Sequence, residues 1–288
     1  MTVRLSGITL FPVKSTRGQS VTSADLEALG LRGDRRWMVV GLDGECLTAR
    51  TDRNLLRLSA TDDGASLRLR APDTEITVAY PAGSQIEVTV HGRPAHGIPA
   101  AQSAQDWVRR ALGRDDARLV HLARPRPLNP DYSQVGDATG FADGYPVTLA
   151  STASLRRLQD WVSETALERG EDPIAIAMDR FRPNLVIENT TADGDLAPFE
   201  EDTWTQVRIG GVDFDVAKPI DRCVLTTIDP DTLEKGAEPI RTLARHRAWD
   251  GKTWFGLQLI PRSTGTLRVG DSIVPQAKPQ SRAASAAS

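Results

Sequence analysis

The chain has 288 residues, which is enough for one large domain or two ordinary ones and for a core that needs no disulfides. Hydrophobic residues make up 40% and charged residues 25%, as in average globular proteins, so composition favours neither global disorder nor a membrane protein. A formal net charge of −3 provides no chain-wide attraction to nucleic acid or anionic lipid, and we expect neither as a partner.

The N-terminus, "MTVRLSGITLFPVKS", lacks the charged, apolar and small-residue sequence of a signal peptide, which predicts a cytoplasmic location. The chain has 2 cysteines, fewer than the roughly four thiolates that an iron–sulfur cluster needs. We therefore expect no internal cluster and, in a reducing compartment, no disulfide. The arginine-rich and alanine-rich composition is typical of a high-GC bacterium.

Short runs of alternating polar and apolar residues predict antiparallel strands with one solvated face. These runs cover residues 35–41, 65–71, 75–80, 85–92, 205–216 and 266–274. In "TQVRIGGVDFDV" (205–216), Gly210 and Gly211 interrupt the alternation, which predicts a tight β-hairpin. We therefore expect a mainly β fold with a few covering helices.

Three segments have helical spacing instead. In "AQDWVRRALG" (104–113), Ser103 is the expected N-cap and Gly113 the expected stop. A second helix should begin near Ser151, and a third should lie in "EPIRTLARHRAW" (238–249), with Pro239 in its first turn. Residues 123–145 have no period and predict a linker or a functional loop, whereas the small, polar tail (276–288) predicts disorder.

Cys223 lies in "KPIDRCVLTTIDPDT" (218–232), beside charged residues. Most cysteines are ordinary core residues. Here, however, Lys218 and Arg222 would favour a thiolate, which is both a nucleophile and a soft metal ligand. His246 could act as a base for a nucleophilic cysteine, but its surroundings resemble no protease signature. Cys46 lies in an apparent strand, and we interpret it as structural.

The 4 histidines lack zinc-type spacing, and the chain has no glycine-rich phosphate-binding motif. Four segments nonetheless combine a turn with a cation or an amide: "PVKSTRG" (12–18), "RGDRRW" (32–37), "FRPNLVI" (181–187) and "DRCVLTT" (221–227). A single cation at a strand end is usually solvated. Four such segments, together with a thiol, indicate a pocket for an anion.

In this order, the four segments resemble the MOSC superfamily, named for the C-terminal domain of molybdenum cofactor sulfurase. More specifically, they resemble the branch that contains the mitochondrial amidoxime-reducing component and its bacterial relatives. The resemblance spans roughly Val3 to Val274 and implies two β-barrel-like units. These are an N-terminal MOSC β-barrel domain (1–122) and a MOSC domain (147–275), joined by a loop (123–146) and followed by the tail.

The resemblance implies a molybdenum cofactor, a pterin whose dithiolene holds molybdenum and whose terminal group is a phosphate, and it gives no reason to expect pyridoxal phosphate. Cys223 stands at the position of the molybdenum-ligating cysteine. The cofactor contacts that we assign are Lys14, Ser15, Arg35, Arg182 and Asn184 from the matching motifs, Arg222 and Thr226 beside the cysteine, and Ser151 and Ser154 at the second helix. Gly144 and Tyr145 stand where the mitochondrial proteins have small hydroxyl residues, so contacts there do not carry over.

The activity that the resemblance implies is reduction of N-hydroxylated compounds, such as amidoximes or hydroxylamines, with two electrons and two protons. We assign Asp221 as the candidate proton carrier, with an ion pair to Arg222 or Lys218 as the alternative. Some bacterial relatives append a ferredoxin-like domain. Without one, we expect a separate electron-transfer protein of the ferredoxin, flavoprotein or cytochrome type.

The alternative function is a sulfur-carrier or molybdenum-cofactor-handling protein that bears a persulfide on Cys223. Such a carrier needs the thiol but less of the pterin pocket. The set of cations and amides at Lys14, Arg35, Arg182 and Asn184 therefore favours the enzyme.

Overall fold

The structure is a computed structural model that describes residues 3–191, 194 and 196–277. Strands predominate in it, and the expected mainly β fold is confirmed. Most of the expected disordered tail, residues 278–288, lies outside the described residues, whereas its first two residues, Gln276 and Ala277, end a strand.

The largest sheet has nine strands. Eight follow the order β2 (Gln19–Val21), β1 (Val3–Leu10), β15 (Leu185–Asn189), β14 (Val147–Ser151), β19 (Lys252–Pro261), β17 (Val212–Asp221), β16 (Trp204–Ile209) and β21 (Ile273–Ala277), and β18 (Ala248–Trp249) pairs with β19. Strands β1 and β2 come from the N-terminal end of the chain. Pairing in this sheet therefore crosses the expected division between residues 1–122 and 147–275.

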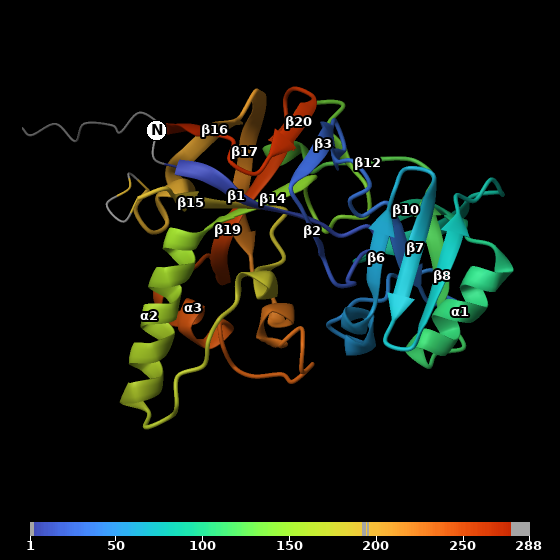
Figure 1. Ribbon diagram of the computed structural model, residues 1–288, viewed down its shortest axis with the longest axis horizontal. Helices are drawn as coiled ribbons and strands as arrows, with labels where there is room; N and C mark the ends of the chain where they lie inside the picture. Colours follow the sequence, from blue (N-terminus) through green and yellow to red (C-terminus); the bar gives the residue numbers. More distant parts are fainter. Residues whose placement is uncertain (1–2, 192–193, 195, 278–288) are drawn as a thin grey trace, which may run out of the picture.

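A second group of sheets belongs to the N-terminal half. One contains β5 (Trp37–Val40), β11 (Arg118–Leu122), β10 (Arg93–Pro99) and β9 (Ile86–Val90), and another contains β6 (Ser59–Asp62), β7 (Ser66–Ala71) and β8 (Thr74–Ala79). A third, of β20 (Gly265–Arg268), β3 (Ser23–Glu27) and β4 (Gly30–Leu31), again joins the two ends of the chain. Figure 1 shows β6, β7 and β8 beside α1 on the right and the large sheet on the left.

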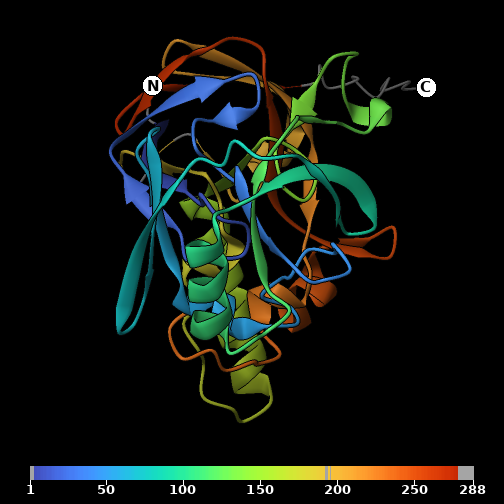
Figure 2. The same ribbon diagram turned by 90° about the vertical axis from the view of Figure 1, so that its right-hand side faces the viewer.

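The described residues form three α-helices: α1 (Gln102–Leu112), α2 (Thr152–Glu168) and α3 (Ile240–His246). Five 3-10 helices connect other elements: η1 (Arg53–Arg57), η2 (Pro130–Tyr132), η3 (Met178–Phe181), η4 (Glu200–Thr203) and η5 (Val224–Thr227). Helices α2 and α3 lie below the large sheet in Figure 1, and the view turned by 90° in Figure 2 shows α1 on the outer side of the N-terminal half.

The predicted hairpin is confirmed, because β16 and β17 pair from Gln206↔Asp215 to Ile209↔Val212. Its alternation has the expected cause: Val207, Ile209, Val212 and Phe214 are all buried in one hydrophobic core. The strands in the predicted runs pair antiparallel with their neighbours, as expected. Strands β14 and β15, which those runs did not include, are parallel, since α2 lies between them in the chain and packs on both.

Three local predictions need correction or refinement. The segment 266–274 contains parts of two strands, β20 and β21, because Gly270, with φ of 98°, turns the chain between them. Ser103 is not the N-cap of α1, which begins after Ala101 without a side-chain cap, although Gly113 ends the helix as expected, with φ of 65°. Residues 123–146 hold a two-stranded ladder of β12 (Arg126–Pro127) and β13 (Ala138–Thr139) within the predicted loop.

Candidate functional site

A cavity of ≈ 350 Å³ lies between the two halves of the chain. Its N-terminal wall includes Lys14, Ser15, Arg35, Thr48, Arg50 and His91, and its C-terminal wall includes Thr148, Arg180, Phe181, Arg182, Ile220, Asp221, Arg222, Cys223, Leu225, Thr226 and Gln258. Residues 142–145 complete the lining. The cavity thus gathers residues that lie far apart in the sequence.

Lys14 is placed by the segment after β1, where its backbone N–H donates to the carbonyl of Trp37 at 2.9 Å. The side chain is buried, and its ammonium donates to the carbonyl of Phe141 at 2.9 Å and to the carboxylate of Asp143. Burial lowers the pKa of Lys14, although Asp143 opposes the shift. The lysine is therefore a fixed cation in the wall of the cavity, beside Ser15.

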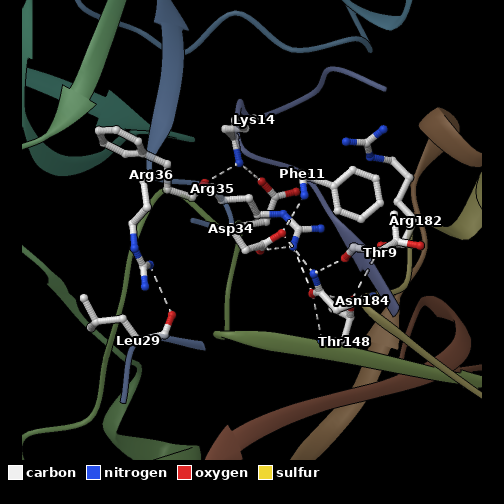
Figure 3. A network of polar contacts seen from close by, with 12 residues as sticks. Thr9, Phe11, Lys14, Leu29, Asp34, Arg35, Arg36, Thr148, Arg182 and Asn184 are labelled. Carbon is white, nitrogen blue, oxygen red and sulfur yellow. Dashed lines mark hydrogen bonds and ion pairs between the residues drawn. The ribbon is translucent and has the colours of Figure 1, made fainter. Parts of the chain in front are cut away.

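Arg35 is held by a network of buried polar side chains, drawn in Figure 3. Its Nη1 donates to Asp34 Oδ2 at 2.5 Å and to Asn184 Oδ1 at 2.9 Å. Asn184 Nδ2 in turn donates to Asp34 Oδ1 at 3.0 Å and to the carbonyl of Thr9 at 3.1 Å. Asn184 is fully buried and does not line the cavity, so it acts on the cavity by positioning Arg35.

Arg182 is the next residue in this wall. It has φ of 51°, and its guanidinium lies 4.2 Å from the centre of the Phe11 ring (Figure 3). Within the described part of the chain, its side chain makes no hydrogen bond and no ion pair. Burial first, and repulsion by Arg35 second, lower the pKa of Arg182 to about 9. A cation held without a counter-ion in a cavity is a ready partner for an anion.

Asp221, Arg222 and Cys223 follow one another at the end of β17. Arg222 donates from Nε to the carbonyl of Phe255 at 2.7 Å and from Nη1 to the carbonyl of Phe181 at 2.9 Å. Burial lowers the pKa of Arg222 to about 9, with Cys223 opposing the shift. Cys223 is a free, partly exposed thiol at the start of η5, and Thr226 beside it lines the cavity.

Asp221 is exposed to the cavity and forms no ion pair with any described residue. The alternative of an ion pair with Arg222 or Lys218 is therefore not found. Arg222 instead uses its guanidinium on backbone carbonyls, which leaves the carboxylate of Asp221 free for other contacts.

Ser151 and Ser154 do not lie in the lining of this cavity. Both are buried at the start of α2, where Ser151 Oγ accepts the N–H of Ser154 at 3.0 Å as an N-cap. Their hydroxyls donate to Glu201 Oε1 at 3.0 Å and 2.6 Å. Their hydroxyl groups are thus engaged by helix capping and by a buried carboxyl group.

The structure adds residues that the sequence patterns did not single out. Asp143 accepts hydrogen bonds from Lys14 and from Arg50 Nη2 at 2.9 Å, and it lies 3.0 Å from His91 Nε2. Burial opposes ionisation, yet Lys14 and His91 hold the pKa of Asp143 well below its usual range. No spacing rule connects residues 14, 50, 91 and 143, because only the tertiary fold brings them together.

Potential metal ligands also converge beside the cavity. Glu45, Cys46 and His91 offer ligand atoms that all lie within 4.8 Å of one another. The buried Lys14 ammonium lies close enough to lower the pKa of the Cys46 thiol against the larger effect of burial, which raises it. A neighbouring fixed cation disfavours a divalent cation here.

The lining contains groups that fit a polar, anionic ring system. Six cationic side chains face two carboxylates, those of Asp143 and Asp221. Five buried polar atoms of the lining have no hydrogen-bond partner among the described residues: Arg50 Nε, Tyr145 OH, Arg180 Nε, Arg222 Nη2 and Gln258 Oε1. Burial raises the pKa of Tyr145 to about 12, so its hydroxyl stays protonated and can donate. A pterin with a phosphate supplies complementary acceptors and donors.

Fold and site define a two-part, mainly β protein with a cationic cavity and one free thiol in its wall. Comparison with known families agrees. The MOSC N-terminal beta barrel domain matches residues 2–115, and the MOSC domain matches residues 136–274. The chain therefore belongs to the MOSC-domain family and carries the N-terminal β-barrel domain.

Curated relatives match nearly the whole chain. Mitochondrial amidoxime-reducing component 1 from Homo sapiens is 31% identical, covering 92% of this chain and 80% of the relative. The Mus musculus protein of the same name is 32% identical, covering 92% and 79%. Mitochondrial amidoxime reducing component 2 from Homo sapiens is 30% identical, covering 92% and 81%.

The relatives' names assign those proteins to mitochondria, so the expected cytoplasmic location and bacterial origin of this chain stay predictions. None of the helices in the described ranges has the length and apolar character needed to cross a bilayer.

Proposed function

We propose that this protein is a molybdenum-cofactor-dependent oxidoreductase that reduces N-hydroxylated compounds of the amidoxime or hydroxylamine type. Electrons would come from a separate donor protein. The observation that carries the proposal is the convergence of a free thiol, Cys223, with the uncompensated cations of Arg182 and Arg222 in one cavity. The relatives' names, which specify amidoxime reduction, support the same activity.

In this proposal the thiolate of Cys223 ligates molybdenum, since a soft thiolate suits the metal. The anionic and polar parts of the pterin would be bound by Lys14, Ser15, Arg35, Arg182 and Arg222. Thr226 lies beside Cys223, the proposed metal ligand. Asn184 contributes indirectly by orienting Arg35. Ser151 and Ser154, with their hydroxyls engaged by Glu201, are left out of the proposed contacts.

The bound cofactor supplies the two-electron redox chemistry, and the protein binds the substrate and handles protons. Reduction of an N–OH group consumes two electrons and two protons and releases water. Asp221, which lines the cavity without an ion pair to any described residue, is the proposed carrier of one proton to the departing oxygen. Replacing it with Asn should lower kcat by about tenfold to a hundredfold while molybdenum content stays high.

Measuring the molybdenum content of the purified protein tests whether it is a molybdenum-dependent enzyme. Protein purified from a molybdenum-replete host should contain near-stoichiometric molybdenum, and Cys223→Ser should lose it. Cys46→Ser is the matched control, because Cys46 lies outside the lining of the cavity, and this variant should retain the metal. A wild-type protein that is free of molybdenum under these conditions would overturn the proposal.

The alternative, a sulfur carrier, uses the same residue in another way. Mass spectrometry would then find an added sulfur atom on Cys223 in metal-free protein. Buried polar atoms of the lining that have no hydrogen-bond partner among the described residues, such as Tyr145 OH and Gln258 Oε1, would have no role in a sulfur carrier. The cavity therefore favours the enzyme.

Turnover is tested with benzamidoxime and a chemical reductant. The molybdenum-loaded protein should convert benzamidoxime to benzamidine, and Cys223→Ser should not. A fully loaded protein that leaves benzamidoxime and simple hydroxylamines unchanged would contradict the proposed reaction.

A further inference from the structure

Three cations lie outside the lining of the cavity and are not used in the proposed cofactor site: Arg93 on β10, Lys218 on β17 and Lys252 at the start of β19. We call them the basic rim. None of the three makes an ion pair with a described residue, and none belongs to the lining of the cavity itself. Arg93 and Lys252 are exposed, and Lys218 is partly buried.

Lys218 links the rim to the cavity. It pairs across the sheet with Gln258, which lines the cavity. Its ammonium lies 5.1 Å from the centre of the Tyr132 ring and 5.9 Å from that of Tyr145, which also lines the cavity. The two rings hold the cation in place without neutralising its charge.

The members of the rim are close enough to repel one another. After burial, the charges of Lys252 and Arg93 lower the pKa of Lys218, and Asp221 opposes this shift. Lys252 also lies over the ring of Trp254, the strand partner of Asp221. Three cations from two separate sheets and one cavity carboxylate, Asp221, are therefore close enough to influence one another.

The cations in the cavity wall and those of the basic rim are expected to bind different anions. Arg35, Arg182 and Arg222 lie in the wall of the cavity, where the proposed cofactor carries its own negative charge. The rim lies outside that wall and keeps its positive charge when the cavity is filled. Its positive potential can attract a second anion, and a substrate that reaches the cavity can bring one.

This inference rests on the proposed function. We infer that the preferred substrates are N-hydroxylated compounds that also carry an anionic group, such as a carboxylate, which binds the basic rim while the N–OH group points to Cys223. The exposed ring of Tyr132 can pack against the body of such a substrate. Because the rim lies outside the lining that contains Cys223, we expect the anion at the end of the molecule remote from the N–OH group.

The test compares 4-carboxybenzamidoxime with its neutral methyl ester on the molybdenum-loaded protein with a chemical reductant. The kcat/KM ratio of acid to ester should be about tenfold at low ionic strength and should decline as salt is added, because an exposed charge contact is screened. In Arg93→Gln, Lys218→Gln and Lys252→Gln, the ratio should fall by about threefold each.

Arg68→Gln is the matched control, since Arg68 is an exposed arginine on β7, away from the cavity lining, that makes no ion pair with a described residue. It removes the same charge from the chain and should leave the ratio unchanged. Equal kcat/KM values for acid and ester in the wild type would overturn the inference. So would a fall in Arg68→Gln as large as that in Arg93→Gln.

Calorimetric binding separates this inference from the proposed reaction. If the loaded protein reduces neither compound, the proposed function fails, and the affinities of acid and ester still report on the rim. Tighter binding of the acid that weakens in Arg93→Gln and Lys252→Gln supports an anion site. Equal binding of the two compounds contradicts it, and the two exposed positions keep the test valid if Lys218→Gln does not fold.

Discussion

The side-chain oxygen of Asn184 accepts a hydrogen bond from Nη1 of Arg35 at 2.9 Å, across 149 residues of sequence. Asn184 also bonds Asp34 and the backbone of β1 and β14, through Thr9 and Thr148. One buried amide thus connects the N-terminal and C-terminal parts of the cavity wall. It makes the position of the Arg35 cation depend on the packing of both halves.

Asn184→Ala should destabilise the cofactor-free protein by about 1–3 kcal/mol, because it leaves several buried polar groups without partners. Urea unfolding of metal-free protein measures this change. Molybdenum content should fall as well, since Arg35 loses its orienting acceptor. Asn54→Ala is the control, because Asn54 is exposed and its side chain makes no hydrogen bond with a described residue. A variant that loses stability but keeps its full molybdenum content would contradict the positioning role.

Arg182→Gln should reduce cofactor binding without reducing the stability of the metal-free protein. The folded pKa of Arg182, about 9, lies well below the ordinary value for arginine, so the folded protein holds the proton less well than the unfolded chain. This cost to stability is fully present below pH 9 and is lost as the pH rises from 9 toward the ordinary pKa of arginine.

The metal-free Arg182→Gln variant should therefore be as stable as the wild type at pH 7.5, or more stable by about 1 kcal/mol after allowance for partial exposure. Its molybdenum content should nevertheless fall. Thermal unfolding and metal analysis provide the two readouts, with the exposed Arg156→Gln as control. A variant that is both less stable and metal-poor would show that Arg182 is a structural residue.

The raised pKa of Glu201 should make the stability of the folded protein depend on pH. Burial raises this pKa to about 7, although hydrogen bonds from Ser154 and Ser151 oppose the shift. The folded protein therefore binds this proton more tightly than the unfolded chain, whose value is near 4.5. The stabilisation is complete below pH 4.5 and is lost as the pH rises through 7, an effect of about 3 kcal/mol.

Glu201→Gln keeps a hydrogen-bonding side chain but removes the ionisation. The difference in unfolding free energy between pH 5 and pH 8 should shrink relative to the wild type, as measured by urea titration. Glu188→Gln is the control, since Glu188 is exposed and unpaired among the described residues. An unchanged pH profile in Glu201→Gln would refute the assignment.

A side chain added at Gly256 should disturb the cavity sterically. Gly256 has φ of +73°, and an added Cβ would lie 2.6 Å from the carbonyl oxygen of Leu149 and 3.2 Å from Arg222 Nη2. Gly256→Ala should lower stability by about 2 kcal/mol or more and should displace the Arg222 guanidinium. Gly211→Ala is the matched control, because nothing lies within 4 Å of its added Cβ. Unfolding experiments should find the control close to the wild type.

Local sequence patterns predicted much of the secondary structure. The alternation around Gly210 predicted the β16–β17 hairpin, since an exposed face and a buried face impose a period of two on the chain. The same reasoning missed the parallel pairing of β14 and β15 and the division of 266–274, because periodicity does not report strand direction or which sheet a strand joins.

For the candidate site too, the sequence predicted some features and missed others. Turn-plus-cation motifs singled out Lys14, Arg35, Arg182 and Cys223, and these four residues line one cavity. The motifs did not reveal that Asn184 acts through Arg35 or that Ser151 and Ser154 face Glu201. Arg50, His91 and Asp143 carried no local pattern at all, and their contacts span up to 129 residues.

The sequence by itself determined the strand-rich composition, the turns and the presence of unusual cations near a free thiol, because these properties depend on residues within a few positions of one another. Only the tertiary structure decided which cations converge, which of them lack counter-ions and which lie outside the lining of the cavity. The physical reason is that burial and Coulomb interactions depend on distance in space, and strands such as β1 and β15 are neighbours in the sheet while lying far apart in the chain.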